Sequence, residues 1–414
     1  MISEFRSVYA DNEELQRERY ASLTENFKSY FSLESDDGIE YFSAPGRTEI
    51  GGNHTDHQHG RVLAAAVNLD IIAAAKKRDD SMIRLKSHEY TKFDEIDISV
   101  LEPKSMEREK SASLIRGIAA RITELGYKVG GFDCYTTSNV LKGSGLSSSA
   151  AFEVLVVTII NHFYNDDKID PVTVAQIAQY AENVYFGKPS GLMDQTASSV
   201  GGFTAIDFND PQKPVLEKIE FNLSDYGHKL CIVDTRGSHA DLTNEYAAVP
   251  VEMKSVAEFF GKNVLREVDE NEFYKNIPAL REKLGDRAVL RAVHFFDENR
   301  RAKEEADKLK EKDFDAFRAL VKESGNSSLM KLQNVFASSD PSHQGLTLAL
   351  ALTERLLKDR GAYRVHGGGF AGTIQAYVPD DLLDEYKTMI ESVFGEGTCY
   401  VLNIRTAGGT KITL

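Results

Sequence analysis

Two patterns of apolar and polar residues distinguish the start of the chain. Residues 4–31 place apolar side chains at helical spacing among many charges, which predicts one or two amphipathic helices. At 39–43 and 62–75 the apolar residues form short runs, and a glycine-rich polar stretch lies between the two runs. This second pattern predicts strand, loop, strand.

Strands and helices continue to alternate in the middle of the chain. Residues 83–88, 93–99 and 131–140 predict further strands. Residues 113–126 have an i, i+3, i+4 apolar pattern that ends at a glycine, which predicts a helix. Residues 143–164 begin as a glycine and serine loop and continue as a segment that is apolar nearly all round. Such a segment is typical of a helix inside a domain.

The second half begins with mainly helical patterns. Residues 171–187 start with proline and end with glycine, which is the usual asymmetry of a helix. A buried strand is expected at 229–234, and mainly helices at 241–360. The charges concentrated in 281–313 predict a solvated face. Strand, loop and strand return at 363–379, followed by a helix at 380–394 and a final strand.

This order of elements predicts an α+β protein with two domains. We place the domains at residues 1–215 and 216–414, with the join in 205–225. The length of 414 residues, of which 42% are hydrophobic, exceeds what one core usually serves and agrees with two domains.

Composition narrows the class of protein. The net charge of −15 opposes any broad surface for nucleic acid or anionic lipid, so we expect neither as a partner. Cys134, Cys231 and Cys399 have no metal-ligand spacing and suggest a reducing compartment. No secretory or membrane-spanning segment is predicted, so we expect a cytoplasmic protein.

The loop Gly143 to Ala151 is the first candidate for chemistry. Small residues precede a long helix, so backbone N–H groups and the positive helix end can surround a phosphate. The P-loop pattern is absent, because no Gly-Lys-Ser or Gly-Lys-Thr follows. A serine-capped helix start is the alternative interpretation.

Three motifs together resemble those of the GHMP kinases, and one of them resembles the galactokinase branch. GSGLSSSAA at 143–151 resembles the phosphate-binding loop of the family. APGRTEIGGNHTDHQHG at 44–60 resembles the galactokinase signature, and VHGGGFAGTIQAY, with its glycine-rich part at 366–372, resembles the C-terminal motif. GLMDQ at 191–195 and SHADLTNEY at 238–246 extend the likeness.

The resemblance implies a fold and a reaction. The fold is that of the GHMP kinases, with a mixed sheet and helices in the N-terminal domain, a sandwich-like C-terminal domain and the active site between them. The reaction is transfer of the γ-phosphoryl group of ATP to the anomeric hydroxyl of galactose, with Mg²⁺ and ATP bound by the protein. Such transfer depends mainly on positioning and charge neutralisation.

The resemblance also assigns roles to residues. Asp194 matches the catalytic aspartate, and Arg47 matches the arginine that keeps this aspartate ionised. Ser149 and Glu182 match the two magnesium contacts, a hydroxyl and a carboxylate that suit a hard cation. The residues expected to bind ATP are Gly143, Ser144, Gly145, Leu146, Ser147, Ser148, Ser149 and Ala150.

Sugar binding is expected at five positions that correspond to sugar-binding positions of the family, and the residue matches the family at all of them except Asn53. The five positions are Asn53, His54, Asp56, Gly191 and Tyr246. A histidine-rich metal site is the alternative interpretation of residues 54–59, yet the histidines lack the helical i, i+4 spacing of a typical ligand pair.

One departure from the family pattern leaves the substrate open. Galactokinases usually carry glutamate, facing the C6 hydroxyl, where this chain has Asn53, and His57 stands where tyrosine is usual. Galacturonate kinases resemble this arrangement, so galacturonate is the alternative substrate. A non-catalytic sugar sensor would be expected to lose the loop or the catalytic pair, and both are present. A mevalonate or homoserine kinase would leave His54 and Asp56 unexplained.

Overall fold

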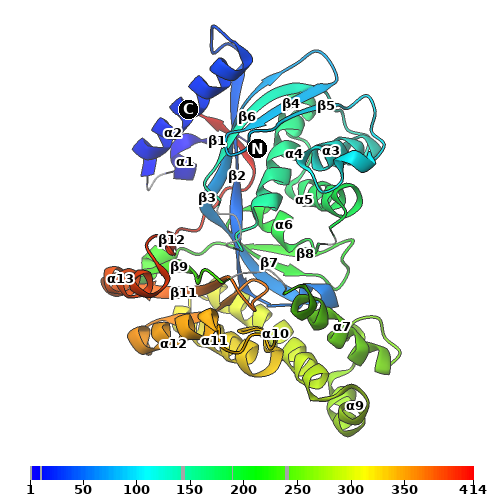
Figure 1. Ribbon diagram of the computed structural model, residues 1–414, viewed down its shortest axis with the longest axis vertical. Coiled ribbons are helices and arrows are strands. Elements are labelled where there is room, and N and C mark those ends of the chain that lie inside the picture. Colours follow the sequence, from blue (N-terminus) through cyan, green and yellow to red (C-terminus); the bar gives the residue numbers. More distant parts are fainter. Residues whose placement is uncertain (1, 10–11, 141–144, 189, 238–241) are drawn as a thin grey trace.

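Two sheets lie one above the other along the length of the molecule in the computed structural model (Figure 1). The structure describes residues 2–9, 12–140, 145–188, 190–237 and 242–414. Among these residues, none of the helices combines the length and the apolar character needed to cross a bilayer.

The larger sheet has nine strands in the order β1-β13-β2-β3-β6-β4-β5, and β7 joins β3 to β8. Pairing is parallel between β1 and β13 and between β4 and β6, and antiparallel elsewhere, so the sheet is mixed. The strands are β1 (Ile2–Glu4), β2 (Ile39–Gly51), β3 (Arg61–Lys77), β4 (Met82–Ser87), β5 (Phe93–Asp97), β6 (Phe132–Ser138), β7 (Phe203–Asp207), β8 (Val215–Ile219) and β13 (Thr410–Thr413).

Helices cover both faces of this sheet (Figure 1). Successive side chains of β3 point to opposite faces of the sheet. Ile72 and Ala74 pack with Phe27 of α2 on one face, whereas Ala73 and Ala75 pack on the other face in the cluster that contains Val154 of α4. The helices are α1 (Phe5–Tyr9), α2 (Glu13–Phe31), α3 (Ser111–Glu124), α4 (Ser148–Asn165), α5 (Pro171–Tyr180) and α6 (Met193–Val200).

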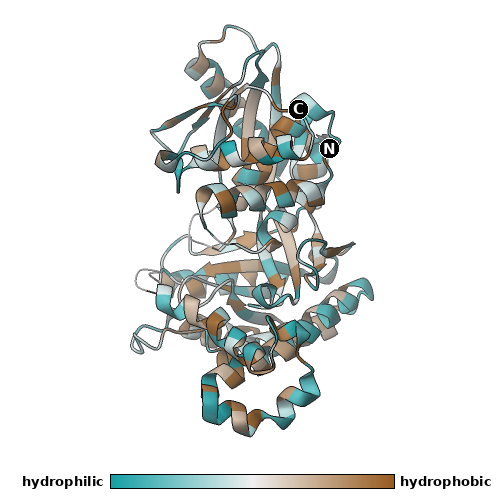
Figure 2. Cartoon of the chain, turned by 90° about the vertical axis from the view of Figure 1, so that its right-hand side faces the viewer, coloured by the Kyte–Doolittle hydropathy of each residue, from teal (hydrophilic) through white to brown (hydrophobic). Residues whose placement is uncertain are grey.

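The smaller sheet has four antiparallel strands in the order β10-β11-β9-β12. Its strands are β9 (His228–Asp234), β10 (Ala362–His366), β11 (Thr373–Pro379) and β12 (Cys399–Leu402). The helices of this half are α7 (Thr243–Phe259), α8 (Glu270–Lys275), α9 (Ile277–Leu284), α10 (Asp286–Lys310), α11 (Phe314–Ser327), α12 (Gly345–Leu357) and α13 (Leu383–Phe394). In Figure 2 the strands are mostly apolar, whereas many helices carry one apolar and one polar side.

Most predicted elements are confirmed, with two differences in the helices. The helix predicted at 171–187 ends as α5 at Tyr180, and a π-helical segment, η4 (Ala181–Phe186), completes it. The prediction that the charges of 281–313 face solvent is wrong for one side of α10. Arg291, Glu298, Arg301 and Glu305 are buried there, because α10 packs against α7 and α11 as well as against β2 and β3 of the larger sheet.

The two halves of the chain do not separate at one point. Strand β8 begins at the predicted boundary of 215 and belongs to the larger sheet, and so does β13 at the end of the chain. The chain therefore passes between the two sheets twice, once after β8 and once after β12. The division into 1–215 and 216–414 stays a prediction, and both β13 and nearly all of β8, which fall in its second part, pair within the larger sheet.

Candidate active site

Arg47 and Asp194 form the centre of the site. Arg47 lies on β2 beside an irregularity in the pairing with β3, and Asp194 lies in the first turn of α6. The Nε and Nη2 atoms of Arg47 are each 2.8 Å from Asp194 Oδ1. A carboxylate in the first turn of a helix is favoured by the helix dipole. Both sequence-predicted catalytic residues are thus in direct contact.

The serine loop contacts the same pair. Ser147 Oγ donates a hydrogen bond to Asp194 Oδ2, and Arg47 Nη1 donates to the Gly145 carbonyl. The backbone N–H of Arg47 donates to the Leu146 carbonyl at 3.1 Å. Ser147, which precedes α4, has a φ of 54°, a conformation that non-glycine residues adopt only where the surroundings impose it.

Electrostatics keep Asp194 ionised. Burial alone would raise the pKa of its carboxyl, but the charge and hydrogen bonds of Arg47, with the Ser147 hydrogen bond, lower the pKa below the usual value. The side chain of Asp194 is 32% exposed, whereas that of Arg47 is 8% exposed. An ionised carboxylate with one side open can accept a proton or orient a hydroxyl.

Asp56 and Gly191 face each other beside this pair. Gly191 precedes α6, and a Cβ atom at this position would overlap Asp56 Oδ2. Burial raises the pKa of Asp56, and the charge of Asp194 raises it further, so the two carboxylates lie within electrostatic reach. Asp56 and Gly191, both predicted to contact the sugar, are therefore brought together next to Asp194.

His54 and Tyr246 both hold the glycine-rich loop that follows β10. His54 Nε2 is 3.0 Å from the Gly368 carbonyl, and the Tyr246 hydroxyl donates to the Gly369 carbonyl at 2.7 Å. A Cβ atom on Gly368 would come within 2.7 Å of the Tyr246 ring, so the glycine permits this approach. The signature loop, α7 and the C-terminal motif thus meet at one place.

Asn53 makes its hydrogen bonds within the protein. Its side chain is completely buried, and its amide nitrogen donates to Glu49 Oε1 at 2.9 Å and to the Gly367 carbonyl at 2.8 Å. Its amide oxygen accepts a hydrogen bond from Asn334 at 2.9 Å. Both donors are thus directed to groups of the protein, and substrate contact by Asn53 stays a prediction. Two of its partners, Gly367 and Asn334, lie far away in sequence, so no local pattern indicates this burial.

Glu182 lies in the π-helical segment η4 and is almost completely buried. Its Oε1 is 2.9 Å from Lys188 Nζ, and its Oε2 accepts hydrogen bonds from Ser190 at 2.6 Å and Gln195 at 2.9 Å. π-Helical segments are frequent at functional sites. The carboxylate is thus anchored through the residue next to Asp194.

The serine loop is described from Gly145 onward. Leu146 and Ala150 are buried, whereas Ser147, Ser148 and Ser149 are half-buried at the start of α4. The predicted positions Gly143 and Ser144 lie outside the described residues. The N–H groups of the first turn of α4 have no partner within the helix, so this end can receive an anion.

Sequence reasoning missed His366, which links the motifs. Its Nε2 is 3.1 Å from Thr48 Oγ1 of β2, and its Nδ1 is 3.0 Å from Thr373 Oγ1 of β11. Burial lowers its pKa well below the usual value, and the charges of Arg47 and Arg364 lower it further, so the ring is neutral. In the sequence, the signal that could have identified His366 was its position directly before three glycines of the C-terminal motif.

Histidine-rich residues 54–59 do not assemble a metal site. The rings of His54 and His57 lie 5.7 Å apart at a tilted angle. Over the part of the chain that the structure covers, no three His, Cys, Asp or Glu side chains are grouped as metal ligands. Burial lowers the pKa of His57 to about 3, so its ring is neutral.

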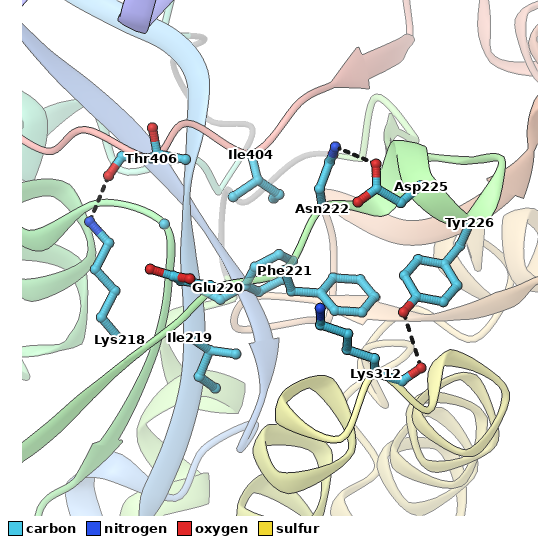
Figure 3. A pocket seen from close by; sticks show the side chains of 12 residues that line it. Lys218, Ile219, Glu220, Phe221, Asn222, Asp225, Tyr226, Lys312, Ile404 and Thr406 are labelled. Atoms are coloured by element: carbon cyan, nitrogen blue, oxygen red, sulfur yellow. Dashed lines mark hydrogen bonds between the residues drawn. The ribbon is translucent and has the colours of Figure 1, made fainter.

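A cavity of about 490 Å³ lies where the chain crosses between the sheets (Figure 3). Phe221 and Tyr226 from the first crossing line it, and so do Ile404 and Thr406 from the second. The hydroxyl of Tyr226 donates to the Lys312 carbonyl at 3.1 Å. The cavity contains none of the predicted site residues, so it is separate from the site at Asp194.

Comparisons with known proteins identify the family of the chain. The family model of the GHMP kinases N terminal domain matches residues 113–202, and the galactokinase galactose-binding signature matches residues 25–77. A galactokinase of Streptomyces coelicolor is 30% identical over 90% of this chain and 92% of its own length. A galactokinase of Glaesserella parasuis is also 30% identical, over 90% of this chain and 93% of its own.

Solved structures show the same fold. The crystal structure of Lactococcus lactis galactokinase complexed with galactose matches with a TM-score of 0.79 and 25% identity, covering 95% of this chain and 99% of its own. The Methanococcus jannaschii mevalonate kinase matches with a TM-score of 0.63 and 16% identity, covering 89% and 99%. The second likeness concerns the fold alone.

Proposed function

The chain belongs to the galactokinase family of the GHMP kinases, and we propose that it transfers the γ-phosphoryl group of ATP to the anomeric hydroxyl of galactose, giving galactose 1-phosphate. The observation that supports this most is the placement of Asp194. It is held by Arg47, contacts the serine loop through Ser147 and lies beside Asp56.

Asp194 and Arg47 carry the chemical step in this proposal. Asp194 accepts the proton of the anomeric hydroxyl or orients that hydroxyl toward the phosphorus. Arg47 keeps Asp194 ionised and offsets the negative charge that develops on the transferred phosphoryl group. Ser147 fixes the second carboxylate oxygen, which leaves the carboxylate in one orientation.

Residues around Asp194 hold the two substrates. The phosphates of ATP lie at the start of α4, against the N–H groups of Gly145 to Ala150. Galactose lies against Asp56, Gly191, His54 and Tyr246, where a carboxylate, a close backbone and two ring side chains can receive its hydroxyls.

In this proposal the side chains of Ser149 and Glu182 would hold magnesium. The donor set is one hydroxyl and one carboxylate, which suits a hard cation that also takes phosphate oxygens. Lys188, which now neutralises Glu182, has a side chain that is 59% exposed and can move aside. Magnesium would supply charge neutralisation on the phosphates. Glu182→Gln should raise the magnesium needed for half-maximal rate, and so should Ser149→Ala, with Ser392→Ala at an exposed serine of α13 as the control.

Galactose is favoured over galacturonate. The relatives with 30% identity are galactokinases, and the argument for galacturonate depended on Asn53 facing the sugar. Since Asn53 is buried with its donors directed to groups of the protein, that argument loses weight. We place the enzyme in the cytoplasm, where its three buried free thiols stay reduced.

The test is phosphorylation by the purified protein with magnesium and ATP, using galactose, galacturonate and mevalonate in parallel. We expect a product phosphorylated at C1 from galactose, identified by the phosphorus coupling of the anomeric proton. A higher kcat/KM for galacturonate, or phosphorylation at another carbon of galactose, would contradict the proposal.

A further inference from the structure

Gln195 lies directly after Asp194 on α6 and connects two buried carboxyl groups. Its Nε2 donates to Glu182 Oε2 at 2.9 Å and to Glu153 Oε2 at 3.1 Å. Gln195 and Glu153 are 0% exposed, and Glu182 is 3% exposed. Glu153 lies on α4 one turn after Ser149, so it belongs to the helix that starts at the serine loop.

Two oxygens of this group have no partner. Glu153 Oε1 and Gln195 Oε1 are both buried and form no hydrogen bond with any residue that the structure describes. Both atoms are acceptors when Glu153 is ionised, and an unsatisfied buried polar atom costs about 1–3 kcal/mol. They belong to the two side chains that already share a hydrogen bond. A proton on Glu153 would convert one of these acceptors into a donor for the other.

We propose that Glu153 is a neutral carboxylic acid paired with the amide of Gln195, and that this acid and amide pair positions the Glu182 carboxylate beside Asp194. Gln195 then has one arrangement, because its oxygen accepts from the acid while its nitrogen donates to both carboxyl groups. Glu182 receives a fixed donor, and α4 is tied to α6 behind the reacting groups. The role of Glu182 in binding magnesium is itself part of the proposed function.

The surrounding charges favour the neutral acid. Burial raises the pKa of Glu153 well above the usual value, and the charge of Glu182 raises it further. Asp194 acts in the same direction, whereas the Gln195 hydrogen bond and the more distant Lys188 lower the pKa of Glu153. With Glu153 ionised, two carboxylates would share one amide in a dry environment.

The first experiment compares Glu153→Gln with Glu153→Leu. An amide at 153 can donate to Gln195 Oε1 and accept from Gln195 Nε2, so it reproduces the neutral pair. We expect Glu153→Gln to keep kcat within about twofold of wild type. Glu153→Leu should raise the magnesium concentration for half-maximal rate by about tenfold, the usual effect of losing a residue that orients a metal ligand, with the KM for galactose unchanged. A loss of tenfold or more in Glu153→Gln would overturn the proposal.

A spectroscopic experiment needs no turnover. Infrared difference spectra between wild type and Glu153→Gln should contain the carbonyl band of a protonated carboxylic acid, contributed by Glu153. If only carboxylate bands differ, the proposal is wrong. This result stands even if Glu153→Leu does not fold.

The same variants and measurements distinguish a failure of this proposal from a failure of the proposed function. Failure of the wild type to phosphorylate galactose would contradict the function, while the infrared band would still report on Glu153. An unchanged magnesium dependence in both Glu182→Gln and Glu153→Leu would overturn the positioning role.

Discussion

Two clusters that start from β2 contain the same kind of ion pair in different surroundings. In the reaction cluster, defined as Arg47, Asp194 and Ser147, the side chain of Asp194 is 32% exposed. In the Asn53 cluster, defined as Asn53, Glu49, Arg364 and Asn334, the Arg364 and Glu49 side chains are 0% and 7% exposed.

The two clusters differ in the direction of their hydrogen-bonding groups and not in the length of their ion pairs. Arg364 Nη2 is 2.7 Å from Glu49 Oε1, and the Arg47 and Asp194 atoms are 2.8 Å apart, so the distances alone do not distinguish them. The Asn53 cluster turns its hydrogen-bonding groups toward the protein, whereas Asp194 keeps one side open. Four variants test this contrast, beginning with the largest expected effect.

Replacing Asp194 by Asn should lower kcat about a thousand-fold, which corresponds to about 4 kcal/mol. The amide keeps an oxygen for Arg47 but loses the negative charge, so the melting temperature should change far less than the rate. Steady-state kinetics and thermal unfolding measure the two effects. Asp286→Asn, at an exposed aspartate of α10, is the control and should leave kcat unchanged. A rate near wild type for Asp194→Asn would remove the reaction cluster from the mechanism.

Replacing Asn53 by Glu should act on stability. A second carboxylate would lie against Glu49 in a fully buried space, and the free energy of unfolding should fall by about 3 kcal/mol. Urea unfolding measures this loss, and Asn209→Glu at an exposed position is the control. A stable variant with an altered KM for galactose would show instead that Asn53 faces the substrate.

Replacing Gly191 by Ala should weaken galactose binding. The new Cβ atom overlaps Asp56 Oδ2 and displaces that carboxylate, so the KM for galactose should rise about tenfold, or about 1.4 kcal/mol. The KM for ATP should change little. Lys262→Ala, at an exposed position just after α7, is the control. Equal galactose KM values in the two variants would place Asp56 outside the sugar site.

The smallest effect concerns pH. Arg47 lowers the pKa of Asp194, so wild-type kcat should not fall between pH 7 and about 5. In Arg47→Gln only burial and the weaker hydrogen bonds remain, and the acidic limb of the profile should move to higher pH. Because the folded pKa lies below the unfolded one, ionised Asp194 stabilises the fold above about pH 4. This stability is lost as pH falls through the folded pKa. If the acidic limb of the kcat profile lies at the same pH in wild type and Arg47→Gln, Arg47 does not lower the pKa of Asp194.

Local patterns in the sequence were sufficient for the helices at 111–124 and 148–165, because their apolar spacing and flanking glycines or serines are short-range signals. The pairing of Arg47 with Asp194 followed from motif resemblance, although the residues lie 147 positions apart. The motifs gave no such signal for the contacts of Asn53. Glu49 and Arg364 lie 315 positions apart, and nothing local marks Asn53 as enclosed by them.

Charge alone also misled the interpretation of α10. The pattern of 281–313 is typical of a solvated helix, yet Glu298 is buried and accepts hydrogen bonds from Ser324 at 2.5 Å and the backbone of Gly52 at 3.2 Å. Only the packing of α10 against the larger sheet explains this burial, and that packing depends on contacts between distant segments.

The return of β13 to the larger sheet affects how the protein is made on the ribosome. Ser43 of β2 pairs with Thr410, so the β2 edge has no neighbour on that side until residues 410–413 have been synthesised (Figure 1). A long unpaired strand edge on a nascent chain invites association with other chains. Nascent chains stalled before residue 410 should therefore bind chaperones that recognise open strands, and release them once β13 has emerged.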